Sequence, residues 1–435
     1  MRRISGFIVG FTAILLLGGF SKTPQPDFSH DVAPVLYRHC ASCHRPGEVA
    51  PFSLLGYKDA ASHASLIASV TAAGFMPPWK PAPGFGDFRN DNHLTEEEIS
   101  TLQRWASAGA PMGDPKEAPA PPHFASDWQL GPPDMVIRMP ESFAVPASGG
   151  DIYQCMVLPL PIAEDRYVAA VEVKPGNRAI VHHAILYLDN GGRAKAFDDK
   201  YPGEGYRCFG GPGFIPSGGL GGWAPGAIPQ RLPEGVGRAL TKNSDLVLQL
   251  HYHPSGRPET DQTSVGIYFT HGPVTKTIYS FALVRRDLSI PAGDAHFASP
   301  IDFTLPIAIE ATAVTPHMHL LGKEMKVTAT LPSGEAKPII WIRNWDFNWQ
   351  GTYQFREPVE LPAGTKLHVD AVYDNSSSNP RNPFSPPRSV SWGENTTDEM
   401  EVAFLQFQTT DPSDRRRIMI SLIRQLDLWK YLDGR

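Results

Sequence analysis

The sequence predicts a mainly β protein that carries a small helical domain at its N-terminal end. The 435-residue chain contains 43 Pro and 39 Gly, a composition that favours short strands and many turns over long helices. From about residue 128 onward, short strand-like runs alternate with turn clusters over more residues than one ordinary sandwich needs. Helical patterns are confined to residues 27–111 and to the C-terminal tail. We therefore expect an all-α domain, two β-sandwiches and a closing helix, in that order.

Residues 1–22 have the pattern of an export signal. Arg2 and Arg3 precede an apolar run that extends from Ile4 to Phe20. No A-x-A cleavage motif follows this run, so a cleaved signal peptide and an uncleaved N-terminal membrane anchor are both compatible with it. Either alternative predicts a protein that is periplasmic or otherwise exported.

The expected helical domain covers residues 27–111. Ser29 or Asp31 can cap a first helix, in which Pro34 is tolerated because it lies near the start. Residues 95–98 (TEEE) form a capping box that opens another helix. The apolar side chains expected on one face of that helix are Ile99, Leu102, Trp105 and Ala106.

The five residues 40–44 read CASCH, which is the motif for covalent attachment of a c-type haem. In this motif Cys40 and Cys43 form thioethers to the porphyrin, and His44 is the proximal iron ligand. A redox disulfide or half of a zinc site would also use two such cysteines, but no second C-x-x-C accompanies them. The motif thus predicts a cytochrome c-like domain with haem c as its cofactor.

A low-spin electron-transfer haem usually takes a methionine as its sixth ligand. Met76 is the first candidate, because the two prolines that follow it hold the backbone rigid and extended. Met112 is the second candidate, and an ordinary core methionine is the alternative for Met76.

The remaining boundaries follow from composition and periodicity. Residues 112–127 are a Pro-rich linker, and the two sandwiches are expected at 128–275 and 276–410. Clear strand patterns occur at 167–173, 245–251 and 326–331.

The tail, residues 411–435, is expected to form a helix capped by Asp411, with Pro412 at its first position. Its apolar stripe consists of Ile418, Leu422, Leu426 and Trp429.

The β region contains three histidine pairs that a cytochrome does not need. On a regular strand, His317 and His319 point to one face and can bind one ion, and the same holds for His251 and His253. His182 and His183 are adjacent, so both can bind one ion only if the chain bends there. The pairs, with Met400, are typical of a copper-binding protein, because imidazoles suit copper or zinc and a thioether favours copper(I).

The chain is not expected to bind nucleic acid. Its formal net charge is −6, and the charged residues occur without long runs of one sign.

From about Trp128 to Gln408 the sequence resembles the copper type II, ascorbate-dependent monooxygenases, the family of peptidylglycine α-hydroxylating monooxygenase and dopamine β-monooxygenase. The segments that carry the resemblance, in the family's order and spacing, are 151–155 (DIYQC), 182–183 (HH), 248–254 (LQLHYHP), 315–322 (TPHMHLLG) and 398–400 (DEM).

The resemblance implies two jelly-roll sandwiches, each with a copper ion. By position, His182, His183 and His251 would bind the electron-storing copper, and His253 would support them. His317, His319 and Met400 would bind the copper where dioxygen reacts. The resemblance also implies a disulfide between Cys155 and Cys208.

Together these features predict a haem-fused copper monooxygenase that hydroxylates a C–H bond of a small organic or peptide substrate with O2. No counterpart of the family's substrate-recognising residues is found, so the substrate does not carry over. The cytochrome is foreign to the family's animal enzymes, and we expect it to replace ascorbate by passing on electrons from an external donor. The alternative is a periplasmic electron-transfer or copper-binding protein without hydroxylase activity.

Overall fold

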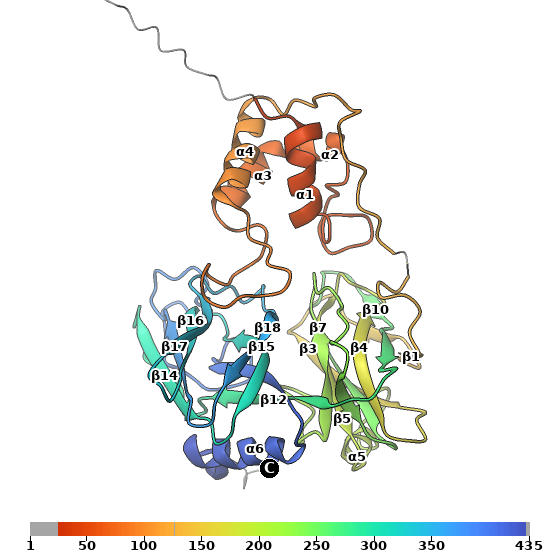
Figure 1. Ribbon diagram of the computed structural model, residues 1–435, viewed down its shortest axis with the longest axis vertical. Coiled ribbons are helices and arrows are strands. Elements are labelled where there is room, and N and C mark those ends of the chain that lie inside the picture. The colour runs from red at the N-terminus through yellow and green to blue at the C-terminus, as the bar shows by residue number, and fades with distance from the viewer. Residues whose placement is uncertain (1–24, 126, 432–435) are drawn as a thin grey trace, which may run out of the picture.

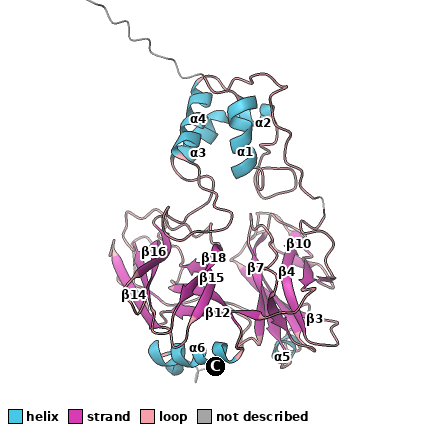
Figure 2. Cartoon of the chain, in the orientation of Figure 1, coloured by secondary structure: helices cyan, strands magenta, loops and turns pink. Residues whose placement is uncertain are grey.

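The computed structural model describes residues 25–125 and 127–431. The predicted signal or anchor at residues 1–22 lies outside the described part of the chain. No helix among the described residues is long and apolar enough to cross a membrane. The prediction of a mainly β protein is confirmed: strands make up two bodies in the lower part of Figure 2, and helices lie above these bodies and at their lower end.

The N-terminal domain is helical, as predicted. Its core is an apolar cluster that includes Phe28, Leu36 and Trp105. The capping box at 95–98 is present, with Thr95 accepting from the Glu98 N–H. The elements are a π-helical turn η1 (Phe28–Val32), α1 (Ala33–His39), α2 (Tyr57–Ser62), α3 (Ala64–Ala72) and α4 (Glu96–Ser107).

The predicted cap of the first helix is wrong. Asp27, rather than Ser29 or Asp31, accepts the hydrogen bond from the His30 N–H. Asp31 instead accepts from the backbone N–H of Asp27, so the two aspartates brace the start of the helix from both sides.

The first β body is a sandwich whose two sheets enclose one apolar core, with side chains such as Leu248 and Ile267 from opposite sheets. One sheet contains, in spatial order, β6 (Tyr206–Arg207), β3 (Ile152–Pro159), β9 (Asp245–Tyr252), β5 (Val181–Asp189) and β7 (Gly218–Trp223). The other contains β1 (Met135–Arg138), β11 (Ser264–Phe269), β4 (Arg166–Lys174) and β8 (Val236–Leu240). A ribbon of β2 (Phe143–Val145) with β10 (Glu259–Asp261), and α5 (Arg193–Asp198), complete it.

The second β body is built in the same way around its own apolar core, which includes Phe303 and Phe407. Its first sheet contains β12 (Lys276–Val284), β21 (Val402–Thr409), β15 (Ile309–His317) and β18 (Tyr353–Leu361). Its second contains β14 (Phe297–Thr304), β19 (Lys366–Tyr373), β16 (Gly322–Thr330) and β17 (Ala336–Ile342). A ribbon of β13 (Ser289–Ile290) with β20 (Val390–Ser391) is added at the edge.

The two bodies share one sheet. β8 pairs in parallel with β12, which joins four strands of each body into an eight-stranded sheet. Figure 1 shows β12 running from one body into the other, with the helical domain placed above both.

The tail forms α6 (Ser413–Gln425) and the short η2 (Leu428–Tyr431). The helix begins one residue later than predicted, because Pro412 occupies the N-cap position instead of the first helical position, and the Asp411 carboxylate before it accepts from the Ser413 N–H. Ile418 and Leu422 are buried as expected, but the helix ends at Gln425 and Trp429 is 59% exposed, so the predicted stripe is too long.

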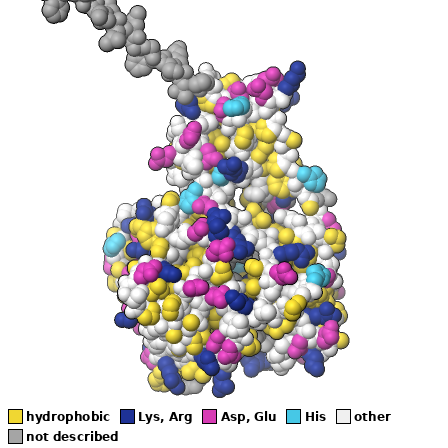
Figure 3. Space-filling model, viewed as in Figure 1, with side chains coloured by type: hydrophobic (Ala, Val, Ile, Leu, Met, Phe, Trp, Pro, Cys, Tyr) yellow, Lys and Arg dark blue, Asp and Glu magenta, His cyan; other side chains and the backbone are white. Residues whose placement is uncertain are grey.

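Charged side chains of both signs are interspersed over the face shown in Figure 3. A narrowing separates the helical domain from the β bodies in the same view, so the domain contacts them through a limited surface.

Candidate metal centres

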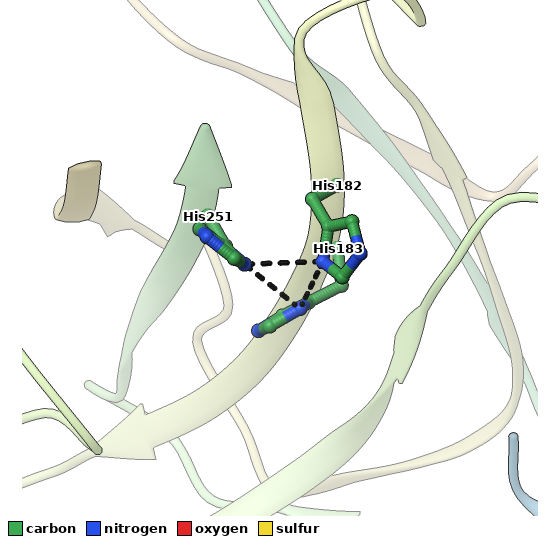
Figure 4. A group of neighbouring side chains, drawn as sticks. All are labelled: His182, His183 and His251. Carbon is green, nitrogen blue, oxygen red and sulfur yellow. Dashed lines mark hydrogen bonds between the residues drawn. The ribbon is translucent and has the colours of Figure 1, made fainter. Parts of the chain in front are cut away.

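Three histidines converge at one end of the first sandwich. The Nδ1 atom of His182 lies 3.2 Å from Nδ1 of His183 and 3.1 Å from Nδ1 of His251, and the third distance, His183 to His251, is 3.4 Å. They come from the neighbouring strands β5 and β9, and their ring nitrogens point toward one another in Figure 4.

A β-bulge in β5 brings the two adjacent histidines together. Val181 pairs with Tyr252 and His183 pairs with His251, so His182 is an extra residue opposite no partner. A bulge bends the strand and changes the direction of the extra side chain. The bend that the sequence required of two adjacent ligands is therefore present.

The spacing of the three nitrogens suits a metal ion. Nitrogens that bind one ion at about 2.0 Å each, spread evenly around it, are roughly 3.5 Å apart. Burial lowers the pKa of His182 to about 4 and that of His183 well below its usual value. Both rings are thus neutral at physiological pH, which is the form that binds metal.

His253 is not part of this group, which corrects the expectation that it faces the same ion as His251. Strand β9 ends at Tyr252, and the side chain of His253 is 72% exposed. Its Nδ1 contacts Asp151 at 2.8 Å, and the other oxygen of Asp151 lies 3.1 Å from His251 Nε2, at an angle that is poor for a hydrogen bond. Burial opposes ionisation of Asp151, but its contacts with both histidines hold its pKa well below the usual range. Asp151 thereby orients His251 from the side opposite to its converging nitrogen.

A second pair lies at the end of β15 in the other sandwich. The rings of His317 and His319 are nearly perpendicular, with centroids 5.1 Å apart. The strand ends at His317, so the two side chains meet through the turn that follows and not through strand alternation as predicted.

Each ring of this pair is held through its Nδ1 atom. His317 Nδ1 contacts Gln350 Oε1 at 2.5 Å, and His319 Nδ1 contacts the Asp398 carbonyl at 3.1 Å. Because both acceptors bind an N–H, the Nε2 atoms are left unprotonated and able to bind a metal. Burial lowers the pKa of His317, and it lowers that of His319 to about 3.

Met400 lies on the segment beside this pair. His317 is paired with Val402 of β21, which begins directly after that segment. The fully buried Glu399 carboxylate accepts from the N–H groups of His319 at 2.9 Å, Leu321 at 2.6 Å and Met400 at 3.2 Å. This carboxylate fastens the backbone of Met400 to the turn that carries His319.

A phenylalanine ring connects the two centres. Phe347, in the loop after β17, stacks on His182 with centroids 6.3 Å apart and meets His319 edge-on at 5.7 Å. The two clusters therefore face each other across the contact between the sandwiches. Sequence spacing contains no signal for this residue.

The CASCH segment forms a tight turn directly after α1, in which Cys43 and His44 donate their N–H groups to the Cys40 carbonyl. His44 Nδ1 lies 3.2 Å from the Phe52 carbonyl, so its Nε2 is the nitrogen that could bind a metal. Burial raises the pKa of the Cys40 thiol to about 12 and also raises that of Cys43.

The candidate sixth ligands differ in their surroundings. Met76 is half-buried after α3, and its N–H donates to the Val70 carbonyl. Met112 is 36% exposed, and its carbonyl accepts from Ser29. Met76 is thus the more enclosed of the two.

Cys155 and Cys208 form the expected disulfide, which links β3 to the segment that follows β6. Gln249 of β9, two residues from His251, donates to the Cys208 carbonyl. The disulfide therefore supports the strand that carries one of the converging histidines.

The supporting residues escaped the sequence reasoning to different degrees. Asp151 and Glu399 lie within the segments that carry the family resemblance, so an acidic residue beside each ligand motif was a usable signal. Gln350 and Phe347 lie in a loop without any motif, and only the folded arrangement identifies them.

No protein-family model matches the chain. Peptidylglycine alpha-amidating monooxygenase of Rattus norvegicus is 29% identical over 213 residues, which cover 47% of this chain and 20% of that protein. DBH-like monooxygenase protein 1 of Homo sapiens is 23% identical over 287 residues, covering 59% and 44%, and DBH-like monooxygenase protein 2 of Mus musculus is 24% identical over 280 residues, covering 57% and 43%.

The chain is a distant homologue of monooxygenases. It spans less than half the length of these curated relatives. Solved structures resemble it weakly: PNGF-II is 11% identical with a TM-score of 0.25, covering 63% of this chain and 65% of that one, and the major capsid protein P2 of bacteriophage PM2 is 9% identical with a TM-score of 0.25, covering 63% and 96%.

Proposed function

We propose that the protein is an exported, copper-dependent monooxygenase that hydroxylates a C–H bond of a small organic or peptide substrate, with electrons supplied through a c-type haem. The two sandwiches would be of the jelly-roll type, each with one copper ion. One ion would bind to His182, His183 and His251, and the other to His317, His319 and Met400.

The observation that carries this proposal is the presence of two different histidine centres that face each other across one aromatic ring, in a chain related to monooxygenases. A protein that only carries electrons needs one redox metal, and a protein that only stores copper does not need two different ligand sets. The two unlike centres therefore favour the enzyme over these alternatives. The disulfide and the signal-like N-terminus favour an exported location.

The reaction fixes the number of electrons. Hydroxylation converts R–H, O2, two electrons and two protons into R–OH and water, so one oxygen atom enters the substrate. When bound at the second centre, copper supplies the activation of dioxygen. The chain's own groups orient the ligand rings: Gln350 and the Asp398 carbonyl do this at the second centre, and Asp151 lies against His251 at the first. The half-buried Phe347 ring lies between the two sets of ligands.

The CASCH turn fits a covalent haem. Cys40 and Cys43 are free thiols beside each other, and His44 presents Nε2. Such a haem accepts and donates one electron at a time, which would match the delivery of two electrons in successive steps.

Metal content tests the two centres separately. Purified protein should contain one covalent haem and about two copper ions per chain, and His183→Ala and His319→Ala should each lose about one copper, because each removes a ligand from a different centre. Plasma mass spectrometry and a haem stain provide the measurement. A single copper that survives His183→Ala would remove the first centre from the proposal.

The haem ligand is tested by Met76→Ala. The axial ligand sets the electronic properties of the iron, so this change should shift the reduction potential and abolish the methionine-to-iron absorption band. Redox titration followed by absorbance makes the measurement, with Met112→Ala as the control. If Met112→Ala causes the change and Met76→Ala does not, the assignment is reversed.

The activity itself is tested with reduced haem, dioxygen and a panel of peptides, amines and aromatic compounds. We expect oxygen uptake that depends on substrate. The product should be heavier than the substrate by one oxygen atom, which is about 16 mass units. Oxidation of the haem without product from any compound would favour the electron carrier.

A further inference from the structure

The haem-binding turn of the helical domain contacts the sandwich that carries the three-histidine centre. Glu48 Oε2 accepts from Arg178 Nη1 at 2.5 Å, and Glu48 Oε1 accepts from Arg45 at 2.8 Å. The side chains of Glu48 and Arg178 are 10% and 28% exposed, so the ion pair is largely shielded from water. Such a pair is costly to break on one side, because the remaining charge stays buried without a partner.

Cys43 makes the second contact. A Cβ atom at Gly226 would lie only 3.2 Å from the Cys43 Sγ, so the backbone of Gly226 approaches this sulfur closely. Gly226 has φ of +83°, a conformation that suits glycine, and it is the third residue after the end of β7. The atom that would carry a haem thioether thus lies against the loop at the end of β7.

Strand β7 leads from this contact to the metal ligands. It pairs with β5 so that Trp223 lies opposite Ala184, the residue next to His183. The Trp223 ring also lies 6.0 Å from the Arg178 guanidinium. Cys43, Gly226, Trp223 and Ala184 therefore form a short series of contacts that ends at a histidine of the first centre.

The helical domain reaches the second sandwich by another segment. The loop between α3 and α4 pairs Phe88 with Phe355 and places Asp87 3.0 Å from Arg356. This ion pair is exposed, with side chains 73% and 57% accessible. Figure 1 shows that loop descending onto the second sandwich, away from the end of α1 that precedes the CASCH turn.

We propose that electrons enter the metal centres at His182, His183 and His251 from the haem at residues 40–44 through β7, and that the Glu48–Arg178 ion pair holds this path in contact. The inference rests on the proposed function. In the step, ferrous haem is oxidised to ferric haem and cupric copper at the first centre is reduced to cuprous copper, one electron for one electron. An external one-electron carrier protein re-reduces the haem.

The test uses the full-length holoprotein without oxygen. The haem is reduced by a light pulse, and its reoxidation by copper is followed by haem absorbance, with the cupric EPR signal as the second readout. Glu48→Gln and Arg178→Gln should each slow reoxidation about tenfold if the docked fraction falls to about one tenth, since the rate follows the competent population. The charge exchange Glu48→Arg with Arg178→Glu should restore part of the rate, because it remakes the ion pair between the domains but places a like charge beside Arg45.

The matched control breaks the other contact. Asp87→Asn and Arg356→Gln remove an ion pair between the helical domain and the second sandwich, and they should leave the rate unchanged. Hydrogen exchange at residues 224–227 of metal-free protein gives an independent readout, and it should rise in Glu48→Gln and not in Asp87→Asn.

Several results would overturn the inference. If Asp87→Asn slows reoxidation of the haem and Glu48→Gln does not, electrons enter through the second sandwich. If neither change matters while product still forms, the path is wrong and the proposed function stands. A purified protein without haem or copper would overturn both together.

Discussion

Replacing Met400 by leucine should stop product formation while leaving haem reduction intact. A thioether favours copper(I) and tunes its reaction with dioxygen, and leucine keeps the volume of methionine without the sulfur. The backbone of Met400 is held at both ends, since its N–H donates to Glu399 and its carbonyl accepts from the Tyr373 hydroxyl at 2.9 Å. The substitution therefore removes a ligand atom and little else.

Loss of an outer-shell partner of a metal typically costs 10–100-fold, so loss of a direct ligand should lower the rate of product formation by at least about 100-fold. Oxygen uptake with reduced haem and a turned-over substrate makes the measurement. Met400→His, which offers copper a different ligand atom, separates loss of binding from loss of reactivity. Equal rates in wild type and Met400→Leu would mean that the sulfur is not a ligand.

Glu399→Ala should empty the second centre and destabilise the fold. Its carboxylate accepts three backbone N–H groups, from His319, Leu321 and Met400, in a site without access to water. Each buried N–H left without a partner costs about 1–3 kcal/mol, so the turn at His319 and the segment at Met400 should separate. We expect about one copper fewer per chain and a lower melting temperature, measured by mass spectrometry and calorimetry.

Glu401→Ala is the matched control. Glu401 is also buried, two residues further along the same segment, but its carboxylate accepts from the Ser299 hydroxyl and not from the backbone N–H groups of His319 and Met400. This variant should lose stability and keep both copper ions. Should Glu399→Ala prove too unstable to purify, Glu399→Asp keeps the carboxyl group but shortens the reach, and it should weaken copper binding at the second centre alone. Full copper occupancy in both Glu399 variants would contradict the role given to this carboxylate.

Helix signals and the coarse fold class were accessible from local sequence. The capping box at Thr95 and the strand pattern at 245–251 depend on neighbouring residues only, and both are present. The cap at Asp27 and the end of α6 at Gln425 were missed, because competing side chains and packing against β12 and β14 decide them.

The candidate ligands show the same difference between what local sequence predicts and what tertiary structure decides. Residue type and spacing were sufficient to single out the three histidine pairs, since the chemistry of imidazole is a property of the residue, and the family resemblance joined His182, His183 and His251 into one set. Whether two adjacent histidines can face one point depends on the bulge opposite His251 and Tyr252, which is a matter of strand register. Register is set by the pairing of β5 with β9, and no single segment contains that information.

Local chemistry thus identified the haem motif, the histidine pairs and the mainly β class, because each depends on residues close together in the chain. Only the tertiary structure placed Phe347 between the two centres, Asp151 behind His251, and Gly226 against Cys43. These contacts join residues from separate strands, loops and domains, and their distances follow from how the sheets pack. Packing of that kind depends on the whole core at once, and it leaves no periodic trace in the sequence.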